Sequence, residues 1–258
     1  MKILLFISLL LYLSILAYVY FTQEDKIFNI AQIEEKEPFS PKDSKKIKLE
    51  VANGIFLDGL YKKSDRHNAL LLIYFGGNSD DAMRFLLHVE HMQDFDIVVF
   101  NYRGYLKSGG VPSEKNLFSD SLKIYDTYAN ARKVVLVGRS LGTGVGAYLA
   151  SKREVDGIIL ITPYDSIVSL AKGKYPFLPI NLLLKYKFES IKHIQKTDAP
   201  IAVIEVKDDK IVPNTNTQKL LQKIKNLALH VELTNTTHTD ILNYQNLGKI
   251  IKEAISKF

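Results

Sequence analysis

The sequence contains no cysteine, and this absence excludes several kinds of site. No disulfide can form, no thiolate can act as a nucleophile, and no zinc ion can be held by cysteine sulfurs. The nucleotide-binding pattern G-x-x-x-x-G-K-[ST] is also missing, which argues against a phosphate cradle of that kind. Glycine and proline number only 14 and 8, and no segment is repetitive. The 258 residues, 47% of them hydrophobic, suffice for one sizeable domain with its core.

Clusters of one charge sign are lacking as well. The net charge of +6 comes mostly from lysines, and these are scattered along the chain. A nucleic-acid-binding surface gathers basic residues on one face or stripe, so we expect no nucleic-acid partner. Scattered lysines leave open a weak attraction to anionic lipid headgroups.

The N-terminus differs in kind from the rest of the chain, because residues 3–21 carry no charge. As a helix these 19 residues would span about 28 Å, close to the hydrocarbon thickness of a bilayer. Tyr18, Tyr20 and Phe21 fall where an interfacial aromatic belt would lie. A cleaved signal peptide is the alternative, but the run is long for one and no A-x-A-like site follows it. We predict a single-pass membrane anchor over residues 1–21, with Lys2 in the cytoplasm and the domain on the non-cytoplasmic side.

The remainder is predicted to be a tether followed by an α/β domain over residues 46–258. Residues 22–45 are charged and show no periodicity, which is typical of a tether. Two alternating runs flank Asn53-Gly54 and predict a hairpin over 46–61. Apolar strands then alternate with helices, which predicts a buried, mainly parallel sheet. We expect strands over 70–75, 97–101, 134–137, 158–161, 201–206 and 229–233, and helices over about 80–92, 114–130, 141–152, 180–195, 214–226 and 244–257.

A candidate nucleophile follows the strand over 134–137. The strand leads directly into G-x-S-x-G, formed by Gly138, Ser140 and Gly142, and a helix of small residues comes next. A serine at such a strand-to-helix turn has a strained backbone and an exposed hydroxyl. Glycines are needed beside it because a Cβ would collide with the neighbouring strand and helix. This context predicts a serine nucleophile at position 140.

A serine hydroxyl becomes an effective nucleophile when an imidazole accepts its proton, and a carboxylate orients that imidazole. Of six histidines, only His238 lies in the loop after the last predicted strand. Asp209 follows the strand over 201–206 and is the preferred acid, with Asp165 and Asp208 as alternatives that could instead cap a turn or helix.

The tetrahedral intermediate of acyl transfer also needs two N–H donors aimed at its oxyanion. One is expected from the amide of Leu141, directly after the serine. The second is expected from the loop Gly76-Gly77-Asn78-Ser79-Asp80, which follows the strand over 70–75. The same loop could simply be a turn in which Ser79 caps the next helix, and a helix start also presents free amides.

These features, in this order, resemble the α/β-hydrolase superfamily. The chain is most similar to the membrane-associated branch that includes protein depalmitoylases and serine aminopeptidase-like hydrolases. Residues 101–114 are similar to that branch's N/D-Y-x-G-Y-G-x-S-x-G-x-P-S-E stretch, and the resemblance covers about residues 46–257. It implies an α/β-hydrolase fold with a small cap and no metal or organic cofactor. It also implies a nucleophile, acid and base at Ser140, Asp209 and His238, with oxyanion amides at Leu141 and Asn78.

The sequence departs from the branch's pattern at two positions. The usual His-Gly-Asn is Gly76-Gly77-Asn78 here, and Leu106 stands where glycine is usual. The first change is expected to affect loop support, because the donor is a backbone N–H, and the second to alter the path of a loop beside the site. Tyr102 and Arg103 are interpreted as structural, with substrate contact as the alternative. Residues 164–192 occupy the usual place of the cap, and their apolar run over 175–188 could line an acyl pocket, touch a bilayer or simply cover the core.

The resemblance implies a serine hydrolase that cleaves carboxylic ester or thioester bonds, with acylated molecules near a membrane, lipid or protein, as substrates. A serine aminopeptidase-like peptidase is one alternative, although no acidic group that would hold a substrate amine is identifiable. A non-catalytic scaffold with the same fold is the other, and the three filled chemical positions argue against it.

Overall fold

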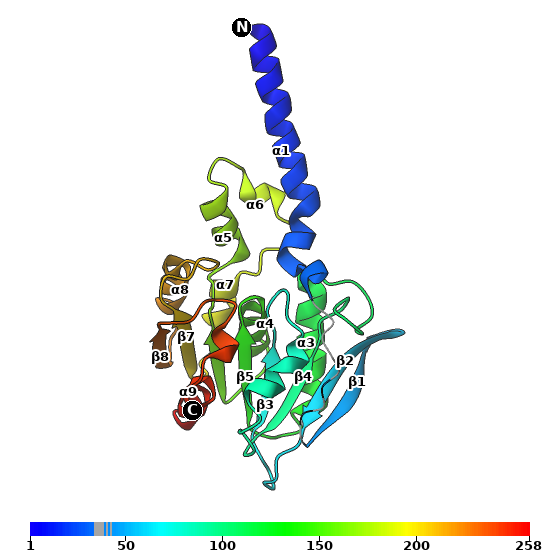
Figure 1. Ribbon diagram of the computed structural model, residues 1–258, viewed down its shortest axis with the longest axis vertical. Helices are drawn as coiled ribbons and strands as arrows, with labels where there is room; N and C mark the ends of the chain where they lie inside the picture. Colours follow the sequence, from blue (N-terminus) through cyan, green and yellow to red (C-terminus); the bar gives the residue numbers. More distant parts are fainter. Residues whose placement is uncertain (34–38, 40, 42) are drawn as a thin grey trace.

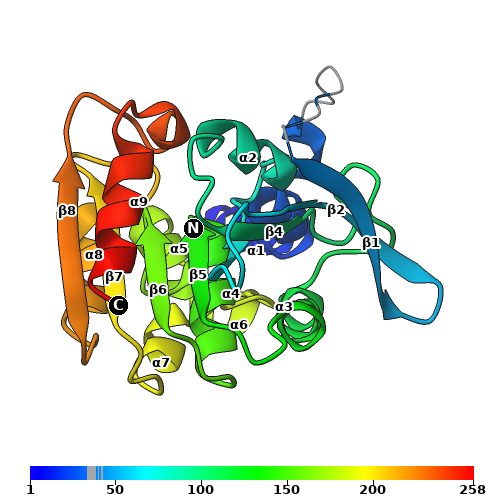
Figure 2. The same ribbon diagram turned by 90° about the horizontal axis from the view of Figure 1, so that it is seen from below.

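The central feature of the computed structural model is an eight-stranded sheet with the order β1-β2-β4-β3-β5-β6-β7-β8 (Figure 2). The structure describes residues 1–33, 39, 41 and 43–258. β1 and β2 form an antiparallel hairpin, β2 is antiparallel to β4, and the other neighbouring pairs are parallel. The predicted hairpin and mainly parallel sheet are therefore confirmed. The strands are β1 (Ser44–Ala52), β2 (Ile55–Lys62), β3 (Leu71–Phe75), β4 (Asp96–Phe100), β5 (Val134–Arg139), β6 (Gly157–Ile161), β7 (Ile201–Val206) and β8 (Leu227–Leu233).

Helices cover both faces of this sheet, which explains why its inner strands are apolar without interruption. Successive side chains of a strand point to opposite faces, so Ile73 packs in one core cluster and its neighbour Leu72 in another. The first cluster is covered by α3 (Glu114–Tyr128), α4 (Leu141–Ala150) and α8 (Asn214–Leu221). The second is covered by the short α2 (Phe85–His88), preceded by a single 3₁₀ turn, and by α9 (Leu247–Ser256). The helix predicted over 80–92 is thus much shorter than expected.

The N-terminal helix α1 (Lys2–Phe28) projects from the globular domain (Figure 1). By length and composition it could cross a membrane, and nearly all of its apolar stretch is exposed. It continues beyond residue 21, so the tether predicted from residue 22 is wrong for its first part. Ile27 and Phe28 are 8% and 2% exposed because this last turn packs on the domain core, which anchors the helix end. Asn29, with φ of 40°, ends the helix, and residues 34–38, 40 and 42 of the predicted tether lie outside the described part.

The segment between β6 and β7 forms a cap of three helices (Figure 1). They are α5 (Ile167–Lys174), α6 (Ile180–Leu183) and α7 (Ser190–Ile194), in place of the single helix predicted over 180–195. The chain is not helical between α6 and α7, because its backbone N–H groups bond to side chains from elsewhere. Lys185 N donates to Gln23 Oε1 at 2.7 Å, while Lys187 N and Phe188 N donate to the Glu114 carboxylate at 2.7 and 2.8 Å. These long-range partners were not predictable from local periodicity.

The close approach of α4 to the end of β3 generates a test of this packing. A Cβ at Gly142 would lie 2.1 Å from the carbonyl oxygen of Phe75, whereas one at Gly173 in α5 would have nothing within 4 Å. We expect Gly142→Ala to lower the free energy of unfolding by about 1–3 kcal/mol, because backbone must move. Gly173→Ala should be neutral or stabilise by less than about 1 kcal/mol. Denaturant unfolding of both variants measures this, and equal midpoints would contradict it.

Candidate active site

Ser140 lies at the turn between β5 and α4. Its φ of 48° and ψ of −117° place a non-glycine residue in a sparsely populated backbone region, and its N–H donates to Ile161 O at 2.9 Å. A Cβ at Gly138 would lie 2.5 Å from Gly142 O, and one at Gly142 would be closer still to Phe75 O. The turn is therefore as tight as the sequence predicts, and glycine is required on both sides of it.

The loops after β5, β7 and β8 bring Ser140, Asp209 and His238 together. His238 Nε2 lies 2.9 Å from Ser140 Oγ, and His238 Nδ1 lies 2.7 Å from Asp209 Oδ2. The imidazole is only 6% exposed. Its two nitrogens thus connect the hydroxyl and the carboxylate in one chain of hydrogen bonds, which is the arrangement needed for proton transfer from the serine.

Asp209 is held as a carboxylate. Burial alone would raise the pKa of Asp209, but the hydrogen bond and charge of His238 and the N–H groups of Val212 and Ile211 lower it below its usual value. The other oxygen, Oδ1, accepts those N–H groups at 2.9 and 2.8 Å. The stabilisation linked to this shift is present above the ordinary aspartate pKa and is lost as the pH falls through the lowered value.

The two alternative acids lie elsewhere. Asp208 is exposed, in a left-handed turn with φ of 57°. Asp165 is buried, and its Oδ1 accepts a hydrogen bond from Asn216 Nδ2 at 2.7 Å. Of the three carboxylates weighed from sequence, Asp209 alone hydrogen-bonds His238.

Strand register places the loop after β3 beside Ser140. Phe75 pairs with Gly138, so Gly76-Gly77-Asn78 starts next to the serine turn. Asn78 is held through both its backbone and its side chain. Its backbone O accepts a hydrogen bond from Tyr105 Oη at 2.9 Å, and its side-chain Nδ2 donates to Lys26 O at 3.3 Å. Leu141 begins α4, where the first amides of a helix lack intrahelical acceptors. Both predicted oxyanion donors therefore lie in segments that border Ser140.

Arg139, which the sequence did not single out, holds these loops in place. Its Nη1 contacts both carboxylate oxygens of Asp80, with 2.6 Å to Oδ2, and its Nη2 donates to His238 O at 2.9 Å and Thr239 O at 3.3 Å. Asp80 Oδ2 also accepts from Gly77 N at 2.6 Å. Burial would lower the pKa of Arg139, but the Asp80 carboxylate raises it, so the guanidinium stays charged. Nothing in G-x-S-x-G indicates this role, because its second position accepts any residue.

The end of α1 borders the same site. Tyr105 Oη hydrogen-bonds the carbonyl oxygens of both Phe28 and Asn78. The Phe28 ring packs edge-on against Tyr186 and Phe188 of the cap, with centroids 5.2 and 6.3 Å apart. The N-terminal helix, the cap and the loop after β3 therefore meet at one place. The sequence analysis assigned the end of this helix to a tether.

The residues of the stretch over 101–114 have structural roles. Arg103 forms a buried, bidentate ion pair with Asp120 at 2.6 and 2.7 Å, and Tyr102 Oη donates to Gly76 O at 2.9 Å. The structural interpretation of both residues is supported by these contacts. Leu106 has φ of 49°, the region that glycine adopts without strain, which explains why glycine is usual there.

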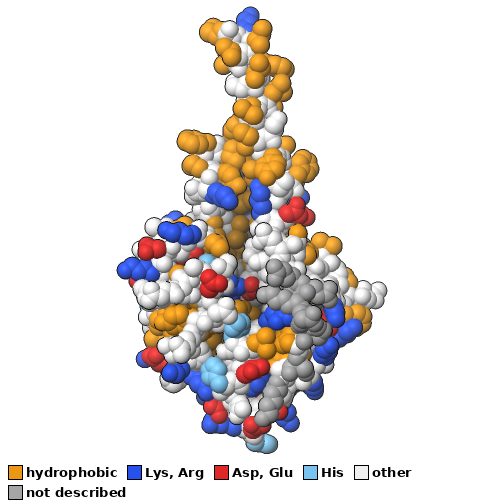
Figure 3. Space-filling view, in the orientation of Figure 1, with side chains coloured by type: hydrophobic (Ala, Val, Ile, Leu, Met, Phe, Trp, Pro, Cys, Tyr) orange, Lys and Arg blue, Asp and Glu red, His pale blue; other side chains and the backbone are white. Residues whose placement is uncertain are grey.

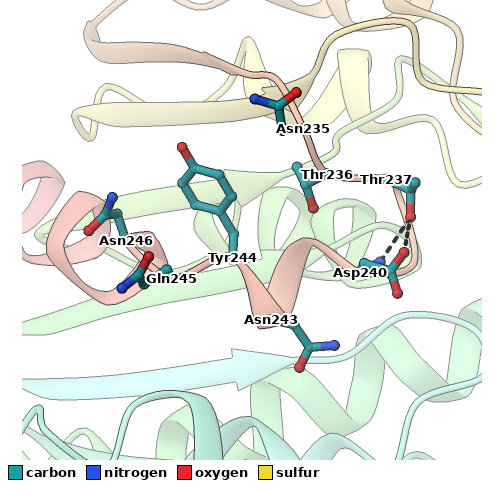
Figure 4. A pocket seen from close by; sticks show the side chains of 8 residues that line it. All are labelled: Asn235, Thr236, Thr237, Asp240, Asn243, Tyr244, Gln245 and Asn246. Atoms are coloured by element: carbon teal, nitrogen blue, oxygen red, sulfur yellow. Dashed lines mark hydrogen bonds between the residues drawn. The ribbon is translucent and has the colours of Figure 1, made fainter.

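Two hollows lie outside this constellation. One of about 620 Å³ is lined by polar residues after β8, where Thr237 Oγ1 donates to Asp240 Oδ2 at 2.6 Å (Figure 4). The other, of about 770 Å³, is lined by residues 125, 131–132, 150–156 and 196–199, which lie near the amino ends of β5, β6 and β7. Neither is lined by Ser140, Asp209 or His238, so they are not the site of the predicted chemistry.

Sequence comparison relates the chain to proteins from bacteria to mammals, although no family model matches it. It is 29% identical over 220 residues to the uncharacterized protein Rv2307c of Mycobacterium tuberculosis, covering 81% of this chain and 77% of that protein. It is 26% identical over 238 residues to mouse lysophosphatidylserine lipase ABHD12, covering 76% and 58% of the two chains. It is 30% identical over 168 residues to the yeast uncharacterized membrane protein YNL320W, covering 61% and 59%.

Structural comparison finds the same architecture in known hydrolases. The Pyrococcus furiosus esterase Pf2001 superposes with a TM-score of 0.66 at 17% identity, over 86% of this chain and 94% of the esterase. An enol-lactonase from Burkholderia xenovorans superposes with a TM-score of 0.63 at 15% identity, over 80% and 99%. At these identities the likeness shows the fold, which is the α/β-hydrolase fold expected from the sequence.

The Arg139–Asp80 pair generates a prediction with a matched control. Arg139→Gln leaves a largely buried carboxylate unpaired, so we expect a loss of unfolding free energy of about 3 kcal/mol or more. Arg153 also pairs with a carboxylate, through Nε and Nη2 to Asp126 at 2.8 Å, but both side chains are well exposed. Arg153→Gln should therefore cost less than about 1 kcal/mol. Thermal unfolding of the two variants measures the difference, and a wild-type midpoint for Arg139→Gln would refute the role given to this pair.

Proposed function

Because this chain belongs to the α/β-hydrolase superfamily, we propose that it is a membrane-associated serine hydrolase that cleaves carboxylic ester or thioester bonds. The observation that carries the proposal is the hydrogen-bond chain from Ser140 Oγ through His238 to Asp209, with donor–acceptor distances of 2.9 and 2.7 Å. In this mechanism Ser140 is the nucleophile, His238 the general base and acid, and Asp209 the group that orients the imidazole.

Catalysis proceeds in two steps. Ser140 Oγ attacks the carbonyl carbon while His238 Nε2 accepts its proton, and the negative oxygen is stabilised by the amides of Leu141 and Asn78. The intermediate collapses as the imidazolium donates the proton to the leaving alcohol or thiol, which leaves an acyl group on the serine. Water then attacks the acyl carbon while His238 accepts one of its protons, and the imidazolium returns that proton to Ser140 Oγ as the acyl–oxygen bond breaks and the carboxylic acid departs.

Ester or thioester cleavage is favoured over aminopeptidase activity by the state of the acidic residues near the site. Holding a substrate amine needs a free carboxylate, but Asp80 is paired with Arg139 and Glu114 accepts two backbone N–H groups of the cap. Glu24 accepts from Tyr186 Oη at 2.9 Å. One mammalian relative is named as a lysophosphatidylserine lipase and one structural neighbour as an esterase, which also favours esters.

Ser140→Ala tests the nucleophile. We expect this variant to lower the rate of p-nitrophenyl ester hydrolysis by several orders of magnitude, because triad members act as one unit. A fluorophosphonate probe should label the wild type at Ser140 and leave the variant unlabelled. Ser151, a part-buried serine at the end of α4, supplies the control: Ser151→Ala should keep both activity and labelling. A folded wild type without any adduct on Ser140 would favour the non-catalytic scaffold.

A substrate panel tests the bond that is cleaved. The chain should turn over p-nitrophenyl acyl esters and acyl thioesters faster than aminoacyl anilides, since Asp80, Glu114 and Glu24 are already held by hydrogen bonds or an ion pair. The acyl chain length is varied in the same panel, from short to long. Faster turnover of aminoacyl anilides would reverse the assignment in favour of the peptidase.

Two truncations test the anchor and separate it from the domain. A chain that starts at Thr22 keeps the packed turn around Phe28, whereas one that starts at Asn29 loses it. We expect alkaline carbonate to leave the full chain in the membrane pellet and to extract the Thr22 form, which should still hydrolyse soluble esters. The free energy of unfolding of the Asn29 form should be lower by about 1.5–3 kcal/mol, because the buried Phe28 side chain is lost. Carbonate extraction of the full chain would contradict a spanning anchor.

A further inference from the structure

The tip of the cap exposes apolar side chains that the mechanism does not use. Residues 175–184, which include α6, contain no charged residue. Phe177 and Leu182 are 88% and 85% exposed, more than any other large hydrophobic residue described after residue 28. Apolar side chains of this size are stabilised when they are removed from water. An exposed apolar patch of this kind marks an interaction surface.

The position of this tip beside α1 indicates what covers it. Tyr12 Oη donates to Phe177 O at 3.4 Å, and Gln23 Nε2 donates to Leu183 O at 3.2 Å, so the cap lies along α1 over several turns (Figure 1). Tyr12 is nine residues before Phe21, about 14 Å along the helix axis. Even allowing for the length of the tyrosine side chain, the backbone at Phe177 is level with the apolar part of α1. A bilayer that contains residues 3–21 must therefore also contain the tip of the cap.

Charged and aromatic side chains mark the edge of this apolar region. Lys172 and Lys174 precede the uncharged run, Lys185 and Lys187 follow it, and all four are exposed. Lysine ammonium groups also lie over tyrosine rings where α1 and the cap meet the domain: Lys26 over Tyr18 at 4.4 Å, Lys185 over Tyr20 at 4.8 Å and Lys174 over Tyr175 at 5.8 Å. Tyrosines and lysines in this arrangement are typical of a membrane interface. Figure 3 shows the same separation, with hydrophobic side chains over α1 and the adjoining cap and charged ones below.

We propose that the tip of the cap, residues 175–184, is inserted into the same leaflet through which α1 leaves the membrane, and that its flanking lysines contact anionic headgroups. The inference rests on the proposed anchoring of α1. It commits to lipid as the occupant, because the patch is continuous with the candidate span and is flanked in the chain by four lysines, of which Lys185 also pairs with Glu24. The hydrolase thus binds the bilayer at two places, and α1 and the cap form one membrane-facing unit.

The insertion links the leaflet to the candidate site. Tyr186 and Phe188, which follow the tip in the chain, pack on Phe28 at the end of α1. Tyr105 Oη in turn hydrogen-bonds the carbonyl oxygens of Phe28 and Asn78. The contact between α1 and the cap therefore connects the leaflet to the loop that is proposed to bind the oxyanion. The substrate class that fits this placement is an ester or thioester with its acyl chain in the bilayer.

The absence of tryptophan from the chain allows a direct test. Full-length Phe177→Trp and Leu182→Trp variants are reconstituted in vesicles of phosphatidylcholine and phosphatidylglycerol that carry bromine on their acyl chains. Each variant has one tryptophan, which is excited selectively at wavelengths where the 14 tyrosines do not absorb, and brominated chains quench it only by contact. Leu11→Trp, near the middle of the candidate span, reports on α1, and Phe56→Trp on β2, which is also exposed, serves as the control outside the membrane.

We expect blue-shifted emission at positions 177 and 182 that loses most of its intensity in brominated vesicles, as at position 11, and unquenched emission at position 56. Quenching at position 11 without quenching at 177 and 182 would overturn the insertion while leaving the anchor intact. Absence of quenching at all positions would overturn both the insertion and the anchor. Blue-shifted emission at 177 and 182 that is not quenched by lipid, together with cross-linked dimers, would assign the patch to a second copy of the chain.

Discussion

The loops that carry the candidate site are held together by the guanidinium group of Arg139. Parallel strands end at one edge of a sheet, but their loops then need contacts that fix their relative positions. Arg139 provides these by pairing with Asp80 after β3 and by donating to the backbone at His238 after β8, while its own strand leads into Ser140. A charged group can be buried at this point because its hydrogen bonds are directed at a carboxylate and carbonyl oxygens. Arg139 thus fixes the positions of the serine, the imidazole and the oxyanion loop relative to one another.

A second constraint joins the N-terminal helix to the site. The last turn of α1 is part of the hydrophobic core, and its backbone carbonyl groups accept hydrogen bonds from Asn78 and Tyr105. The cap is tied to α1 by Gln23, which both accepts from Lys185 N and donates to Leu183 O, and to the sheet domain by Glu114. In this arrangement the end of α1 is a structural element of the α/β domain, and the tip of the cap lies level with the apolar part of the helix.

Much of the candidate site was predictable because its chemistry is local in sequence. The strained turn at Ser140 is encoded by glycines two residues away on either side, and the structure shows the contacts that exclude a Cβ there. His238 and Asp209 were predicted from their positions after strands, since parallel strands deliver such loops to one edge of the sheet. The supporting residues Arg139, Tyr105 and Glu114 were not predictable, because each contacts residues at least 27 positions away in the chain.

Local patterns in the chain suffice to specify the apolar N-terminal helix, the alternation of strands and helices, and the residue types at the serine turn, because each depends on side chains only a few positions apart. Long-range contacts set where α1 ends, how the cap is divided into three helices and which carboxylate contacts His238. Residues 22–28 and 184–188 take their conformations from distant partners such as Glu114 and the core around Phe28. Whether Asp209 or Asp165 faces the imidazole likewise depends on loop paths that strand order alone leaves open.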